Sequence, residues 1–81
     1  MILPEKHLKL SESILGLGAF VLSQIKNPKD IDGVWTEYQK AYTARRYPAY
    51  HTFENLILAI IFLYTLGVVQ MDGNGRLTKC A

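Results

Sequence analysis

Cysteine and histidine are scarce in this chain, which has one cysteine and two histidines among 81 residues. A single cysteine, Cys80, excludes a disulfide within the chain and a zinc site built from several cysteines. His7 and His51 lie far apart in sequence, and neither has a paired acid or a second histidine at helical spacing beside it. We therefore expect no metal and no cofactor. The lone thiol fits a reduced, cytoplasmic setting.

Charge of one sign is also lacking, because nine basic and seven acidic residues leave a net charge of only +2. So small an excess does not by itself indicate binding to nucleic acid or to an anionic membrane. Hydrophobic residues make up 49% of the chain and charged residues 20%. One small core cannot easily hide so much apolar surface, which favours a protein partner over a small self-sufficient domain.

No hydrophobic run is long enough for a membrane span. The longest, Leu56 to Val69, includes Thr65 and Gly67 and falls short of the about 20 residues that a span needs. Near the start of the chain, Glu5 and Glu12 interrupt the sequence, and no small-residue cleavage site follows the first apolar run. We expect neither a membrane segment nor a secretion signal.

Catalytic motifs are missing as well. The chain has no glycine-rich phosphate loop of the Walker type, and its serines have no nucleophile-elbow context. The run Asp72-Gly73-Asn74-Gly75 imitates part of a calcium loop. However, Gln70 and Ala81 occupy positions where that loop requires acids. We expect this protein not to be an enzyme.

The elements that remain predict one domain over residues 1–81, mostly α with a small C-terminal β-hairpin and similar to a winged helix. An arm over 1–9 precedes helices at about 11–25, 31–44 and 52–66, and a wing hairpin follows at about 68–79. Ser11, Asp30 or Asp32, and Thr52 are the candidate N-caps. Gly67 can supply the left-handed residue that ends the third helix.

The third predicted helix is apolar on nearly every side and contains neither lysine nor arginine. A helix that reads a DNA groove needs donors for base edges and cations for phosphates. We therefore expect this helix to be buried and not to bind DNA.

The N-terminal arm and the first helix are the expected partner contact. Ile2 and Leu3 are apolar residues near a chain end, and the first helix has apolar residues on two sides. Gly16 and Gly18 would let a partner approach closely, so Gly18→Leu is expected to disrupt assembly without unfolding the domain. The proposed partner-binding set is Ile2, Leu3, Pro4, His7, Leu17 and Gly18.

Four cations are candidates for contact with a DNA backbone. Arg76 and Lys79 lie on the predicted wing, and Arg45 and Arg46 lie in a connector that also carries tyrosines. Mixtures of cations and aromatic rings can hold single-stranded nucleic acid through phosphate contacts and base stacking. The simpler interpretation, which we favour, places Tyr38 and Tyr42 on the core face and leaves the arginines solvated.

Taken together, these residues resemble a small prokaryotic family, the type 6 middle component of ABC-three-component conflict systems. The resemblance rests on Ile2-Leu3-Pro4 with Lys6-His7, Leu15 to Ala19, Trp35, Thr52-Phe53, Leu58-Ala59-Ile60, Leu63 to Gly67, and Asp72 to Leu77.

The resemblance implies a winged-helix-like adaptor without chemistry of its own, encoded between an ABC or SMC-type ATPase and an effector, often a nuclease. Lamassu-type defence against phage and plasmids is organised in this way, and DNA could be contacted indirectly, through the complex; whether it touches this subunit is left open by the sequence. The alternative is a winged-helix transcription regulator that binds duplex DNA as a dimer.

Overall fold

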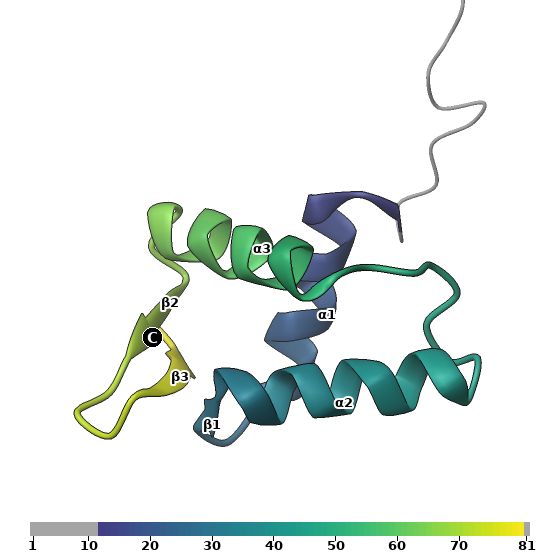
Figure 1. Ribbon diagram of the computed structural model, residues 1–81. Helices are drawn as coiled ribbons and strands as arrows, with labels where there is room; N and C mark the ends of the chain where they lie inside the picture. The colour runs from purple at the N-terminus through teal and green to yellow at the C-terminus, as the bar shows by residue number, and fades with distance from the viewer. Residues whose placement is uncertain (1–11, 81) are drawn as a thin grey trace, which may run out of the picture.

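The computed structural model describes residues 12–80, which form three helices and three short strands (Figure 1). The order along the chain is α1 (Ile14–Gln24), β1 (Lys29–Asp30), α2 (Ile31–Thr43), α3 (Phe53–Thr65), β2 (Val69–Met71) and β3 (Arg76–Lys79). The predicted fold class is confirmed: the chain is mostly helical, ends in an antiparallel hairpin and is compatible with a winged-helix-like fold. The predicted arm over 1–9 lies outside the described residues.

The helix starts follow from the capping residues in the sequence. The Asp30 carboxylate accepts from the Gly33 N–H at the start of α2, and the Thr52 hydroxyl accepts from the Asn55 N–H at the start of α3. At α1 the N-cap is Ser13 and not the expected Ser11. The Ser13 hydroxyl accepts from the Gly16 N–H, and the helix begins at Ile14. Ser11 lies outside the described residues.

Gly67 ends α3 as predicted, with a left-handed φ of 79°. The Gly67 N–H donates to the Tyr64 carbonyl at 3.0 Å and the Val68 N–H to the Leu63 carbonyl at 3.1 Å. These two bonds satisfy carbonyls that the helix would otherwise leave without a partner. The chain is thereby turned directly into β2.

The sheet has one strand more than the sequence predicted. Strand β1 pairs antiparallel with β3, so that the order is β1-β3-β2 and β3 is central (Figure 1). Because β1 has two residues and follows Pro28, it has no alternating pattern by which the sequence could reveal it. Val69 and Leu77 point from the hairpin into the core.

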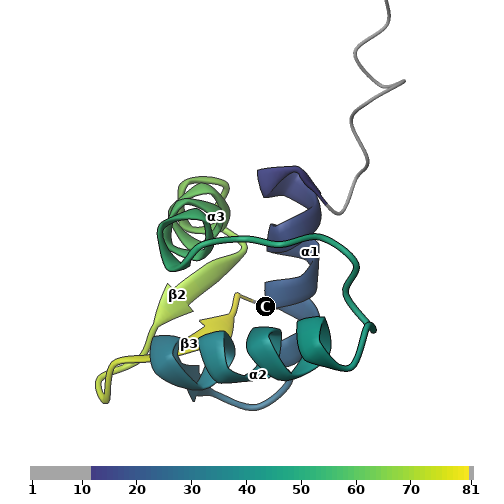
Figure 2. The same cartoon turned by 45° about the vertical axis from the view of Figure 1, so that its right-hand side comes forward.

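The core forms along α1, which extends from beside α3 to the level of α2 (Figures 1 and 2). A Cβ atom built at Gly18 would lie 3.3 Å from the Leu63 Cδ2 atom, so the glycine lets α1 approach α3 closely. Leu17 beside it is fully buried. Both positions therefore serve the core. Both residues are buried in the described domain, and the partner contact expected of them stays a prediction.

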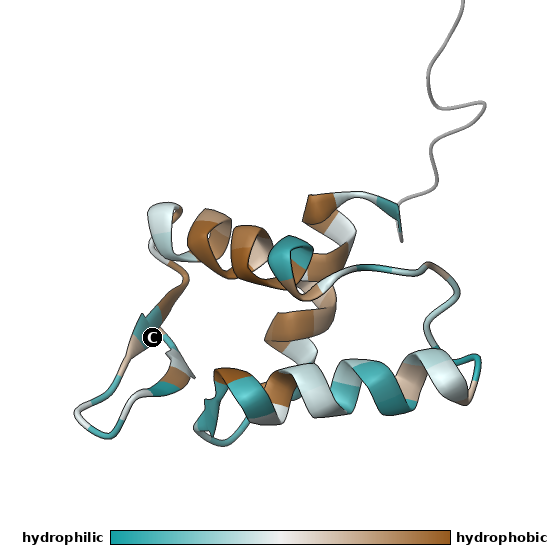
Figure 3. Ribbon diagram, viewed as in Figure 1, coloured by the Kyte–Doolittle hydropathy of each residue, from teal (hydrophilic) through white to brown (hydrophobic). Residues whose placement is uncertain are grey.

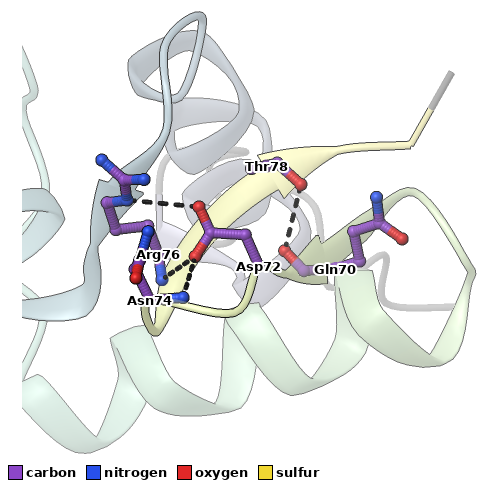
Figure 4. Close-up of polar contacts among 5 residues, drawn as sticks. All are labelled: Gln70, Asp72, Asn74, Arg76 and Thr78. Atoms are coloured by element: carbon purple, nitrogen blue, oxygen red, sulfur yellow. Dashed lines mark hydrogen bonds and ion pairs between the residues drawn. The ribbon is translucent and has the colours of Figure 1, made fainter.

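The wing turn is held by one carboxylate, that of Asp72 (Figure 4). Its Oδ1 accepts from the Asn74 N–H at 2.8 Å and the Arg76 N–H at 2.9 Å. Its Oδ2 lies 3.2 Å from the Arg76 Nε. Gly75 supplies the positive φ of 75° that closes the turn. Accepting the backbone N–H of Arg76 is the largest of the effects that hold the pKa of Asp72 below its ordinary value of 3.8.

We expect Gly18→Leu to destabilise the fold, contrary to the expectation from sequence. The added side chain would press on Leu63, and overpacking of this kind costs about 1–3 kcal/mol. The matched control is Ala19→Leu, which places the same side chain on the exposed side of the same helix and should change stability by less than about 0.5 kcal/mol. Urea unfolding followed by circular dichroism measures both. Equal stability of the two variants would contradict the packing described.

The wing should loosen in acid. Because folding lowers the pKa of Asp72, its carboxylate stabilises the folded hairpin above the unfolded value of 3.8, and that contribution is lost as the pH falls through the folded pKa. Nuclear magnetic resonance should show the amide signals of Asn74 and Arg76 titrating together, with a midpoint below 3.8. Asp72→Asn should abolish this titration. A midpoint at or above the ordinary value would show that the carboxylate does not hold the turn.

Candidate interaction surface

The outer face of α3 carries five of the eleven large hydrophobic side chains that are exposed among the described residues. It consists of five side chains between 38% and 62% exposed, namely Leu58, Ile61, Phe62, Tyr64 and Leu66. Hydropathy colouring shows α3 apolar along most of its length, whereas α2 is mainly polar after its first turn (Figure 3). We call these five residues the α3 outer face.

Helical spacing explains why these side chains form one surface. Leu58, Ile61 and Phe62 follow the i, i+3, i+4 pattern, which places them side by side on one side of a helix. Leu56, Ala59, Ile60 and Leu63 are buried on the other side. The expectation that all of α3 would be buried is therefore wrong for the α3 outer face, because α1 covers only one side of the helix.

The α3 outer face has no cation for binding phosphate. Helix α3 contains no lysine or arginine, and its first turn carries the acidic residue Glu54. A face of this composition removes apolar surface from water only when another apolar surface covers it, so its chemistry suits docking against an apolar surface. Separately, no helix within residues 12–80 is long and apolar enough to cross a membrane.

The described residues among those expected at a site are spread over the core, the wing and the end of α2. Ile2, Leu3, Pro4 and His7 lie outside the described residues, while Leu17 and Gly18 are in the core. On the wing, Arg76 is paired with Asp72 and Lys79 is exposed. Arg45 and Arg46 are exposed at the far end of α2.

Arg45 holds an unusual backbone conformation for a residue with a side chain, a φ of 62°. Its N–H donates to the Tyr42 carbonyl at 3.0 Å, and the Arg46 N–H donates to the Ala41 carbonyl at 2.8 Å. This is the same helix ending that Gly67 provides for α3, with arginine in the position that favours glycine. The result is a sharp exit from α2 with two cations at its tip.

Tyr38 fixes the connector between α2 and α3, which spans residues 44–52. Its hydroxyl donates to the Ala49 carbonyl at 2.7 Å and accepts from the His51 N–H at 2.6 Å. Burial raises the pKa of Tyr38, and it does the same for the neighbouring Tyr47. Sequence reasoning placed Tyr38 in the core but missed this tether, because no local pattern links a helical tyrosine to a loop 11 residues later.

His51 is also placed by this arrangement. It is buried, and its Nδ1 lies 3.1 Å from the Asn55 amide nitrogen, which donates to it. Within residues 12–80, no three histidine, cysteine, aspartate or glutamate side chains gather in a way that could hold a metal ion.

Comparison with known proteins gives one family. Neither the curated proteins nor the solved structures include a match to this chain. The family described as "ABC-three component (ABC-3C) system Middle Component 6" matches residues 3–80, which is nearly the whole sequence. That span includes all three helices, the sheet and the α3 outer face. The chain therefore belongs to the middle component 6 family of ABC-three-component systems.

Proposed function

We propose that this protein is a non-catalytic adaptor that docks another component of its system through the α3 outer face. The observation that supports the proposal is the exposure of five large apolar side chains on a helix without cations. Membership of a middle-component family implies partner components. In its finer form, the proposal names these partners as an ABC or SMC-type ATPase and a nuclease effector, within a cytoplasmic defence complex of the Lamassu kind.

The occupant of the α3 outer face should be an apolar groove between helices of the partner. Side chains at i, i+3 and i+4 on one helix are the usual anchors of helix-in-groove docking. Full burial of one leucine, isoleucine or phenylalanine side chain contributes about 1.5–3 kcal/mol, so two or three such anchors can supply most of the energy of a specific contact. The polar hydroxyl of Tyr64 lies on the same helix and can sit at the rim.

The rival function is that of a winged-helix transcription regulator. The side chains of α3 suit this function poorly. In such proteins a helix enters the major groove and presents donors to base edges. Here that surface would bring leucine, isoleucine and phenylalanine to the bases and no cation to the phosphates. The adaptor function uses the same residues for an interaction that suits their chemistry.

We expect Ile61→Asp to weaken assembly by more than about 30-fold, the size expected for loss of a central anchor of at least about 2 kcal/mol. A buried carboxylate facing an apolar groove would add a desolvation cost. Co-purification with the neighbouring components, followed by titration calorimetry, measures the loss. Ile61 is 54% exposed, so the variant should retain the circular dichroism spectrum of the parent.

The matched control is Leu15→Asp, which makes a similar change on α1 at a side chain that is 57% exposed. Its carboxylate would lie in the first turn of a helix, where negative charge is favourable. Assembly should be retained in this variant. Loss of assembly with Leu15→Asp but not with Ile61→Asp would contradict docking through α3 and move the contact to the first helix.

A further inference from the structure

The C-terminal end of α2 carries a second surface, different in character from the α3 outer face. Three shallow hollows meet at Thr43, which lines all of them. Tyr42 and Arg45 line the first, Lys40 and Arg46 the second, and Tyr42 and Tyr50 the third. We call Tyr42, Arg45, Arg46 and Tyr50 the cationic-aromatic surface.

Two aromatic rings on this surface face solvent. Tyr50 is 70% exposed and Tyr42 is 40% exposed. Tyr42 stacks on the buried Tyr38 with an interplanar angle of 21°, and Tyr50 meets Tyr42 edge-on with ring centroids 5.8 Å apart. The exposure of Tyr50 therefore leaves a ring face open for a flat ligand, and Tyr42 holds that ring in place.

The positive charge beside these rings is not neutralised. The ion pairs within residues 12–80 join Lys40 to Glu37 and Arg76 to Asp72, so neither Arg45 nor Arg46 has a carboxylate partner there. No acidic residue occurs between positions 38 and 53 of the sequence. None of the described residues that line the three hollows is acidic either. An anion can thus approach without meeting local repulsion.

Arg45 adds an independent observation. The left-handed conformation costs a residue with a side chain about 1 kcal/mol relative to glycine, which would end the helix equally well. The arrangement instead places a guanidinium at the exposed tip of α2, where Arg45 lines the same hollow as Tyr42. Strained backbone of this kind is found more often at binding sites than elsewhere.

We propose that the cationic-aromatic surface binds single-stranded nucleic acid. One base stacks on Tyr50 and the adjoining phosphates lie against Arg45 and Arg46. Ring faces and unpaired guanidinium groups together are what sequence-tolerant binding of single strands requires. This contact goes beyond the adaptor function and uses a different part of the molecule. In Figure 1 the end of α2 and the connector lie on the opposite side from the C-terminal half of α3.

Other anions fit the surface less well. Duplex nucleic acid could engage both arginines, but its bases are stacked within the helix and leave Tyr50 without a partner. An acidic peptide would likewise use the charges and not the open ring face. The open ring beside unpaired cations therefore favours a strand whose bases are free to stack.

The test measures binding of fluorescent oligo(dT) and oligo(U) of equal length to the full chain by anisotropy, at low and raised salt. Tyr50→Ala should weaken binding about tenfold through loss of one stacked base, and Tyr50→Phe should retain it. Arg45→Gly removes the cation in a backbone conformation that glycine adopts without strain, so it should weaken binding while leaving the fold as stable or more stable. The logarithm of the affinity should fall with that of salt with a slope of about −1.4 for two phosphates.

The matched control is Lys26→Gln, which removes one positive charge from an exposed position between α1 and β1. It should bind the oligonucleotides as the parent does. Absence of binding, equal loss in Lys26→Gln and Arg45→Gly, or retention in Tyr50→Ala would each overturn the proposal. Equal affinity for polyglutamate or for duplex of the same length would also overturn it, because neither ligand offers bases to the ring. Assembly through Ile61 is measured separately, so either proposal can fail alone.

Discussion

The contact between α1 and α3 at Gly18 and Leu63 is the constraint on which the rest of the structure depends. Because a glycine faces Leu63, the two helices approach closely and bury Leu56, Ala59 and Leu63 on one side of α3. A domain of this size has no second layer to place on the other side. Because α3 is apolar on nearly every side, the side that α1 does not cover stays exposed among the described residues.

That arrangement separates two kinds of surface on one small domain. The α3 outer face gains energy by leaving water, an interaction that added salt does not weaken. The cationic-aromatic surface gains energy by meeting phosphate, and salt screens it. Assembly of the complex and contact with nucleic acid should thus respond to salt in different ways. On the wing, Arg76 is already paired with the Asp72 carboxylate, whereas Lys79 is exposed.

Local chemistry in the sequence predicted most of the fold. It was harder to predict which side of each helix is covered by the other elements. Thr52, Asp30 and Gly67 act within one turn of the residues that they cap, so their roles could be inferred directly. Strand β1 exists only because β3 lies beside it, and two residues carry no periodic signal of that pairing. The apolar stripes of α1 were visible in sequence as well. Which of them meets α3, and hence that Leu17 and Gly18 are buried, is decided by packing between distant segments.

The column of rings along α2 shows how one periodic pattern can serve both core and surface. Tyr38 and Tyr42 were predicted to share the core face, and the rings of Trp35, Tyr38 and Tyr42 stack in sequence order. Their environments differ along the helix: Trp35 is partly covered, Tyr38 is buried, and Tyr42 reaches solvent. The Tyr38 hydroxyl forms hydrogen bonds with the connector, and these bonds fix the segment that carries Tyr50. The same buried tyrosine therefore supports the ring of Tyr42 by stacking and positions that of Tyr50 by hydrogen bonding, so that a core residue sets the geometry of the exposed pair.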